Sequence, residues 1–162
     1  MLNRVLNSVA NRLRSYLERM NDRTLKSKLK FCGSSVSIEH PVSFQGLEQI
    51  SIDDDVSIAA FVHVWGNGGL TIGKRVMIAS NTSITTITHD HGRADMYKTI
   101  VAAPVVIEDD VWIGANSVIM PGVRLKKGCV IGAGSVVTKD VESMTIVAGV
   151  PARLLKTREI CS

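Results

Sequence analysis

The sequence has few aromatic residues, few cysteines and no long apolar run. Phe, Trp and Tyr make up only 4% of its 162 residues, and Cys32, Cys129 and Cys161 lie far apart with no CxxC pair or Cys/His cluster. This odd, scattered set favours neither a disulfide framework nor a structural zinc site, and it fits a reducing compartment. No segment approaches the roughly 20 apolar residues of a membrane-spanning helix, and arginines interrupt the N-terminus too often for a signal peptide. The sequence therefore predicts a cytoplasmic protein.

Basic residues are scarce outside the first 30 positions. Residues 1–30 carry eight Lys and Arg against two acidic residues, whereas the rest of the chain carries eleven against thirteen. Composition changes at the same place, because residues 31–162 hold all 15 Ile and 18 of the 20 Val. This β-branched body is slightly acidic and has no basic stripe with interleaved aromatic residues, which argues against a nucleic-acid partner. We expect one modest soluble domain.

Aliphatic residues recur every six positions in the C-terminal half, and small or β-branched residues recur four positions after each of them. A six-residue period matches neither an α-helix nor an alternating strand, so each hexapeptide is predicted to be a short strand followed by a bend. The first register consists of Ile107, Ile113, Ile119, Leu125, Ile131 and Val137, and the second of Val111, Ser117, Val123, Cys129, Ser135 and Val141.

Three such hexapeptides close a triangular coil. Coils of this kind stack about 4.8 Å apart by parallel β hydrogen bonding and point their aliphatic residues into a common core. The period predicts an all-β solenoid of about five coils. Coils are expected at 52–69 and 72–89, two more over 107–142, and a less regular first coil over 31–51.

Three segments stand apart from the repeat. The hexapeptide body is expected over 31–145, and an excursion at 90–106 interrupts it; a loop of that length in a compact solenoid is usually functional, so we expect the chemistry there. Residues 146–162 form a C-terminal tail. Residues 1–30 place Leu and Val at helical spacing, which predicts a basic amphipathic helix. We favour its packing on the open end of the solenoid or on a partner subunit; the alternative is peripheral attachment to an anionic surface at the inner face of the membrane.

Motifs in the second half resemble those of a known family. They are VWIGA at 111–115 with PGV at 121–123, IGAGSVVTKD at 131–140 and VAGVPAR at 147–153. By these motifs the chain resembles the hexapeptide-repeat acyltransferases, which include galactoside, maltose and nodulation-factor acetyltransferases. The resemblance extends over about residues 50–156. It alone implies a left-handed parallel β-helix, because parallel crossovers are otherwise nearly always right-handed.

The resemblance also implies a homotrimer that transfers an acetyl group from acetyl-CoA to an acceptor hydroxyl. The family's general base matches His89, and a neutral imidazole suits this task because its ordinary pKa is near 6.5. His91 is the second candidate for the base or for the acceptor site. Asp90 and Asp95 are candidates to orient an imidazole, and His63 is placed where it would reach a subunit interface.

The donor site is implied in the same way. Backbone groups near two alanines would contact the pantetheine arm, cations near the C-terminus would meet the negative charges of CoA, and an outward-pointing tryptophan would line the groove. No metal is expected. The residues implied to contact acetyl-CoA are Trp112, Ala115, Ala133, Thr138, Lys139, Arg153 and Lys156.

The acceptor site departs from that of the sugar-specific members. Those enzymes carry an Asn on an earlier coil, where this chain has Ala59. The short coil and the basic N-terminus look more like the O-acetyltransferases of surface-polysaccharide and lipopolysaccharide assembly. Transfer to an amine or to an antibiotic stays open as an alternative within the family.

Two other classes of protein are compatible with the predicted solenoid. A γ-class carbonic anhydrase would bind a metal through three histidines. The spacing of His89 and His91 does not match that family, and the C-terminal motif would go unexplained. A non-catalytic solenoid is allowed by the repeat, but it would leave Thr88-His89 and the segment from Lys139 to Arg153 without a role.

Overall fold

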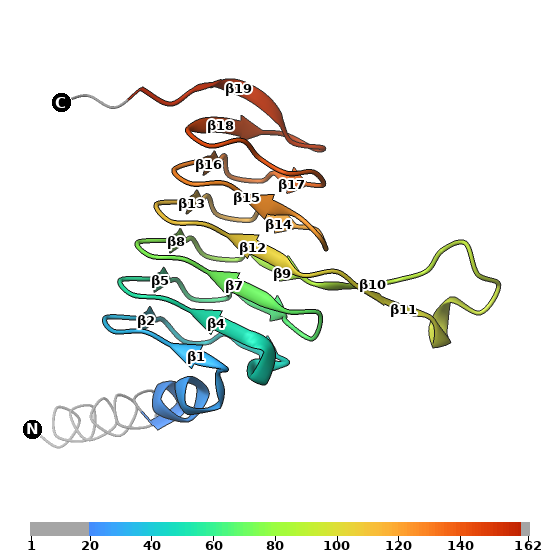
Figure 1. Ribbon diagram of the computed structural model, residues 1–162, viewed down its shortest axis with the longest axis horizontal. Helices are drawn as coiled ribbons and strands as arrows, with labels where there is room; N and C mark the ends of the chain where they lie inside the picture. The colour runs from blue at the N-terminus through green and yellow to red at the C-terminus, as the bar shows by residue number, and fades with distance from the viewer. Residues whose placement is uncertain (1–19, 160–162) are drawn as a thin grey trace, which may run out of the picture.

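The chain folds into a prism of stacked coils (Figure 1). The computed structural model describes residues 20–159, so most of the predicted N-terminal helix lies outside the described residues. The chain is helical over 20–28, makes five complete coils and begins an incomplete sixth. The predicted all-β solenoid of stacked coils is therefore confirmed.

Each face of the prism is a parallel sheet to which every complete coil contributes one strand. The first face contains β1 (Phe31–Cys32), β4 (Ile50–Ile52), β7 (Leu70–Ile72), β12 (Val105–Ile107) and β15 (Arg124–Leu125). The second contains β2 (Ser37–Ile38), β5 (Ser57–Ile58), β8 (Met77–Ile78), β13 (Trp112–Ile113), β16 (Val130–Ile131) and β18 (Thr145–Ala148). The third contains β3 (Ser43–Gln45), β6 (His63–Trp65), β9 (Ser83–Thr85), β14 (Val118–Ile119) and β17 (Val136–Val137).

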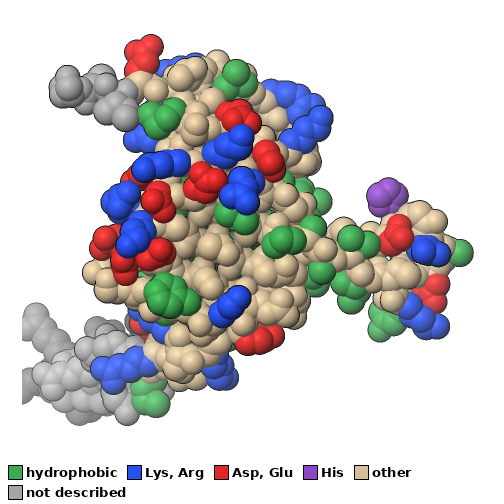
Figure 2. Space-filling view, in the orientation of Figure 1, with side chains coloured by type: hydrophobic (Ala, Val, Ile, Leu, Met, Phe, Trp, Pro, Cys, Tyr) green, Lys and Arg blue, Asp and Glu red, His purple; other side chains and the backbone are tan. Residues whose placement is uncertain are grey.

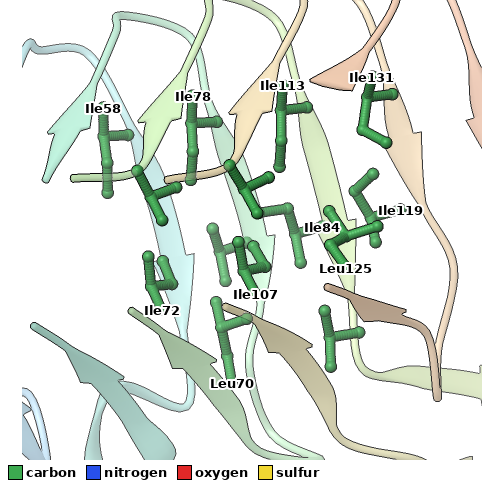
Figure 3. Packing of buried hydrophobic residues seen from close by; sticks show 14 of the residues in the cluster. Ile58, Leu70, Ile72, Ile78, Ile84, Ile107, Ile113, Ile119, Leu125 and Ile131 are labelled. Atoms are coloured by element: carbon green, nitrogen blue, oxygen red, sulfur yellow. The ribbon is translucent and has the colours of Figure 1, made fainter. Parts of the chain in front are cut away.

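The core is a set of aliphatic columns that run along the prism (Figure 3). Side chains from equivalent positions of successive coils stack on one another, as Ile58, Ile78, Ile113 and Ile131 do on the second face. Both predicted six-residue registers are buried in the structure. The second register sits at the corners, where the hydroxyls of its serines donate to nearby carbonyl oxygens, as Ser117 does to Gly114 over 2.7 Å. Burial therefore leaves these polar groups paired.

The corners turn through residues with positive φ. We call the corner between the first and second faces the first corner, and the next two the second and third. Gly114 at the second corner lies so close to the next coil that a Cβ there would be 2.6 Å from the Ala133 amide nitrogen. The left-handed residues are Ser35, Asp55, Arg75, Asp110, Gly128 and Met144 at the first corner, and Phe61, Asn81, Asn116 and Gly134 at the second.

Ion pairs between coils line the first corner, at the left in Figure 2. The Lys74 ammonium lies 2.9 Å from the Asp54 carboxylate one coil below, and the Arg75 guanidinium binds Asp110 one coil above through two nitrogens. Asp54 also accepts hydrogen bonds from the Ser34 amide and hydroxyl, both at 2.9 Å. These contacts, led by the one from Lys74, lower the pKa of the Asp54 carboxyl to about 2.

The two ends of the prism are built differently. Below the first coil, Leu25 and Leu29 of the helical segment and its exit pack against the core. Beyond the fifth coil, β18 extends the second face in parallel, and β19 (Arg153–Thr157) then pairs with β18 in the antiparallel direction. Within residues 20–159, no helix has the length and apolar character needed to cross a membrane.

A hairpin leaves the prism at the third corner, between the third and fourth coils (Figure 1). It consists of β10 (Ile87–His89) and β11 (Ile100–Ala102), which pair antiparallel, with the short 3₁₀ helix η2 (Met96–Lys98) near its tip. A second 3₁₀ helix, η1 (Leu47–Gln49), follows β3. His89 is thus not the end of the third coil, as its sequence position suggested, but part of the projecting hairpin.

We predict that Asp54→Asn lowers stability at neutral pH and that the loss disappears in acid. The folded-state pKa of Asp54, about 2, is below its ordinary value of 3.8, so the stabilisation is complete above roughly pH 4 and is lost as the pH falls through 2. Urea unfolding of both proteins between pH 7 and pH 2 measures the difference. In a Lys74→Met background the difference should shrink, since the largest cause of the shift is gone. A difference that stays constant over this pH range would contradict the assignment.

Candidate active site

His89 is fixed by a bond to the backbone of its own hairpin. Its Nδ1 lies 2.7 Å from the Met96 carbonyl oxygen in η2. A carbonyl oxygen has no proton to donate, so Nδ1 must carry the hydrogen of this bond. In the neutral ring, Nε2 is then left with its lone pair free. The local geometry therefore selects the tautomer that accepts a proton at Nε2.

A groove of about 320 Å³ opens beside His89 at the third corner. It lies between the end of β6, the end of β9 and the two strands of the hairpin. Of the described residues that line it, none carries a Lys, Arg, Asp or Glu side chain. Its walls are Trp65, Thr85, Ile87, Thr88, His89 and Ile100.

His91 and the two carboxylates of the hairpin, Asp90 and Asp95, do not contact the His89 ring through any hydrogen bond of the described residues. Asp90 accepts from the Gly92 amide over 3.0 Å, and Asp95 accepts from the Lys98 amide over 3.4 Å at the start of η2. Both carboxylates thus stabilise turns, and the Met96 carbonyl holds the His89 ring in place of them. His91 is exposed and does not line the groove.

His63 lies on the prism and not in the hairpin. Its ring stacks on the Trp65 indole, with centroids 3.8 Å apart and planes 19° apart. The Nε2 atom of His63 is buried and has no hydrogen-bond partner among the described residues. Within this chain, His63 therefore packs against Trp65, and it is not among the residues that line the groove.

Three of the residues expected at the donor site lie around one cleft. Thr138 and Lys139 follow β17 at the third corner, two coils above the hairpin, and Arg153 begins β19. All three line a cleft of about 380 Å³ at the C-terminal end of the prism. Lys156 lies three residues further along β19, opposite Ile146, and does not line this cleft.

The other expected donor contacts lie elsewhere on the prism. Trp112 projects from the second face between Met77 and Val130 and is 49% exposed. Ala115 and Ala133 stack at the second corner, where the Ala115 carbonyl accepts from the Gly134 amide over 2.8 Å. A single chain therefore does not gather Trp112 and the two alanines around His89.

Two features of the site escaped sequence reasoning. The Met96 carbonyl is a backbone group, for which no residue type gives a signal. Trp65 had a weak signal, since it occupies the outward position on β6 that pairs with Thr85, just before the excursion. In the described part of the chain, no three His, Cys, Asp or Glu side chains gather as metal ligands.

Comparison with known proteins identifies the relatives of this chain. A family model described as the hexapeptide repeat of succinyl-transferase matches residues 104–139. The galactoside O-acetyltransferase of Escherichia coli K12 is 32% identical over 133 residues, which are 82% of this chain and 66% of that protein. The E. coli K12 protein WbbJ, provisionally named a lipopolysaccharide biosynthesis O-acetyl transferase, is 35% identical over 66% of this chain and 60% of its own length. The chain thus spans about two thirds or less of these curated relatives.

A solved structure matches more completely. The hexapeptide-repeat acetyltransferase of Vibrio cholerae superposes with a TM-score of 0.83 at 31% identity, over 94% of this chain and 90% of that one. The same protein has been solved with acetyl-CoA. The match confirms the left-handed parallel β-helix that the motifs implied. The chain belongs to the hexapeptide-repeat acetyltransferase family.

Proposed function

We propose that this protein transfers an acetyl group from acetyl-CoA to a hydroxyl of a sugar, in the assembly of a surface polysaccharide or lipopolysaccharide. The observation that carries the proposal is the tautomer of His89. Its Nδ1 hydrogen is committed to the Met96 carbonyl, which leaves Nε2 free, and the residue lines a groove whose described walls carry no charged side chain. The names of the E. coli relatives, a galactoside and a lipopolysaccharide O-acetyltransferase, support a hydroxyl acceptor.

Direct transfer fits this geometry. Acetyl-CoA supplies the acetyl group as a thioester. His89 takes the hydroxyl proton at Nε2 as the acceptor oxygen forms its bond to the acetyl carbonyl carbon. It returns the proton to the sulfur as the carbon–sulfur bond breaks. The Met96 carbonyl keeps the ring in one orientation and stabilises the charge that the imidazole gains for a moment.

The C-terminal cleft fits the charged end of the donor. Lys139 and Arg153 place two cations around a space of about 380 Å³, and Thr138 adds a hydroxyl. Asp140 and Glu142 also line it, but both carboxylates are engaged, Asp140 by the Arg124 amide and Glu142 by the Lys126 ammonium. CoA carries several phosphate charges, for which cationic side chains are the favoured partners. We assign these three residues to the nucleotide end, with Lys156 at its margin.

We also propose that three copies of the chain assemble the complete site. The projecting hairpin exposes apolar side chains, among them Tyr97 at 87%, Ile100 at 64% and Met96 at 51%. An isolated two-stranded hairpin is marginally stable in water, and such a patch needs cover. A neighbouring prism would supply that cover. It would also bring a second face, with Trp112 and the corner of Ala115 and Ala133, toward the hairpin.

The first prediction concerns the donor and the oligomer. Titration calorimetry with acetyl-CoA should show about one site per chain, and light scattering on the same sample should give the mass of a trimer. The absence of measurable binding would exclude the proposed reaction. A monomer that binds acetyl-CoA would leave the donor in place and contradict the shared site.

The second prediction assigns the base. His89→Ala should lower kcat by about 10²–10⁴-fold, because proton transfer in the transition state is lost, and should leave the Kd for acetyl-CoA nearly unchanged. Steady-state kinetics with a glycan acceptor and calorimetry measure the two quantities. His91→Ala is the comparison. Near-normal turnover of His89→Ala with a large loss in His91→Ala would move the role to His91.

The third prediction concerns the cations. Lys139→Ala combined with Arg153→Ala should raise the Kd for CoA by about tenfold or more, because charge-assisted contacts to phosphate are lost. Binding of pantetheine, which lacks the nucleotide, should change little. Arg75→Ala, which removes a cation from the opposite corner, serves as the control. An equal rise in Kd for CoA and for pantetheine would place these cations away from the nucleotide.

A further inference from the structure

The groove beside His89 has one aromatic wall, and it is not supplied by the hairpin. Trp65 ends β6 in the second coil and pairs with Thr85 in the coil above. Both residues point outward on the third face, and the threonine is much smaller than the indole. The step in size leaves space above Trp65, and β10 begins beside that space and carries His89 to its rim.

The backbone that carries Trp65 is held rigidly. Thr86 is fully buried, and both its amide and its hydroxyl donate to the Trp65 carbonyl oxygen, over 2.9 and 2.7 Å. The Thr86 hydroxyl in turn accepts from the Gly68 amide over 2.7 Å. Only glycine fits at position 68, because a Cβ there would collide with the Thr86 carbonyl oxygen. The strand end is thus tied to the base of the hairpin.

The Trp65 side chain is held as well. His63 lies two residues earlier on the same side of β6, and its ring covers one face of the indole at 3.8 Å. The Nε2 atom of His63 is also buried, and it has no hydrogen-bond partner in the part of the chain that the structure describes, which costs stability. An unpaired buried nitrogen needs an explanation, and a fixed orientation of Trp65 provides one. The groove is therefore lined by an indole whose backbone and one ring face are both held in place.

We propose that Trp65 is the platform on which the acceptor ring stacks, and that the acceptor is a neutral pyranose. The inference rests on the proposed function and adds the substrate class. A pyranose presents C–H groups on one face and hydroxyls at its rim, so one ring can pack on the indole while one hydroxyl meets Nε2 of His89. The described residues that this chain contributes to the groove offer no cation to a carboxylate or a phosphate, and we therefore favour a neutral sugar. His63 acts as a positioning residue for Trp65.

Fluorescence tests the platform without any acetyl transfer. The chain has two tryptophans, so Trp112→Phe leaves Trp65 as the sole indole fluorophore. We expect at least one of the methyl glycosides of galactose, glucose and N-acetylglucosamine to change the fluorescence emission of Trp65. The change should saturate as the glycoside concentration rises. Sorbitol, an open-chain polyol with no ring face, should not change the emission. An emission that none of the three glycosides changes would overturn the inference.

Steady-state kinetics then distinguish aromatic stacking at position 65 from an effect of side-chain size alone. Trp65→Leu should raise KM for the glycoside about tenfold or more and change kcat by less than about threefold, whereas Trp65→Phe should restore most of the loss. His63→Ala should raise KM by a smaller factor. Phe31→Leu removes an exposed aromatic ring from β1 in the first coil and should change neither constant. Equal KM values for Trp65→Leu and wild type, or for Trp65→Leu and Trp65→Phe, would overturn the stacking role.

The two proposals can fail separately. If acetyl-CoA does not bind, the proposed function fails, and the response of Trp65 to the glycosides still decides whether a sugar platform exists. If acetyl-CoA binds and glycosides are acetylated with the same KM in Trp65→Leu, the transfer reaction stands and the platform does not. Acetyl-CoA calorimetry on Trp65→Leu confirms that the variant is folded, because its Kd should match the wild type.

Discussion

The stacking of each inward side chain on its equivalent in the next coil governs the whole molecule. Parallel hydrogen bonds fix the vertical spacing, and the aliphatic columns require every coil to return to the same register. An inserted residue inside a strand would turn the core residues outward. Variation is tolerated where a strand has ended, and all the larger insertions here are at the third corner. The projecting hairpin occupies such a position, from which extra chain can leave without disturbing the columns.

This constraint also explains why the C-terminal cleft lies above the groove along the same edge of the prism. Trp65 and Thr85 end strands of the third face in the second and third coils, and Thr138 directly follows the strand of that face in the fifth coil. Stacking therefore aligns residues that are far apart in sequence along one edge. The first corner carries the ion pairs, whereas the second carries Ala115, Ala133 and the exposed Phe61, so their surfaces differ in character. A neighbouring copy of the chain would meet three corners with different surfaces. This difference favours a single way of packing one prism against another.

The six-residue period predicts the solenoid and both buried registers, because aliphatic residues recur in the first register and small or β-branched residues in the second. It places an excursion after the third coil but starts it at residue 90, whereas the hairpin strands are Ile87–His89 and Ile100–Ala102. The motifs then supplied the hand of the helix, which periodicity does not determine. The details of the site were less accessible. The partner of His89 is a backbone carbonyl, and its position depends on the fold of η2. The sequence placed His89 at the end of a coil, since the pairing of Ile87 with Ala102 within the hairpin follows no period. Trp65 was overlooked because an isolated outward aromatic residue is common on any solenoid face.

The reversal of the chain at β19 has a consequence for growth of the stack. The last strand of a stack of parallel coils exposes the same row of backbone N–H and C=O groups that pairs neighbouring coils. A second molecule could pair with that row and extend the stack. β19 occupies that edge in the opposite direction, and the helical segment at 20–28 lies against the other end. On the second face, an incoming parallel strand then finds no matching register at the C-terminal end. The change of strand direction at β19 therefore closes one of the three edges along which a further coil would have to pair.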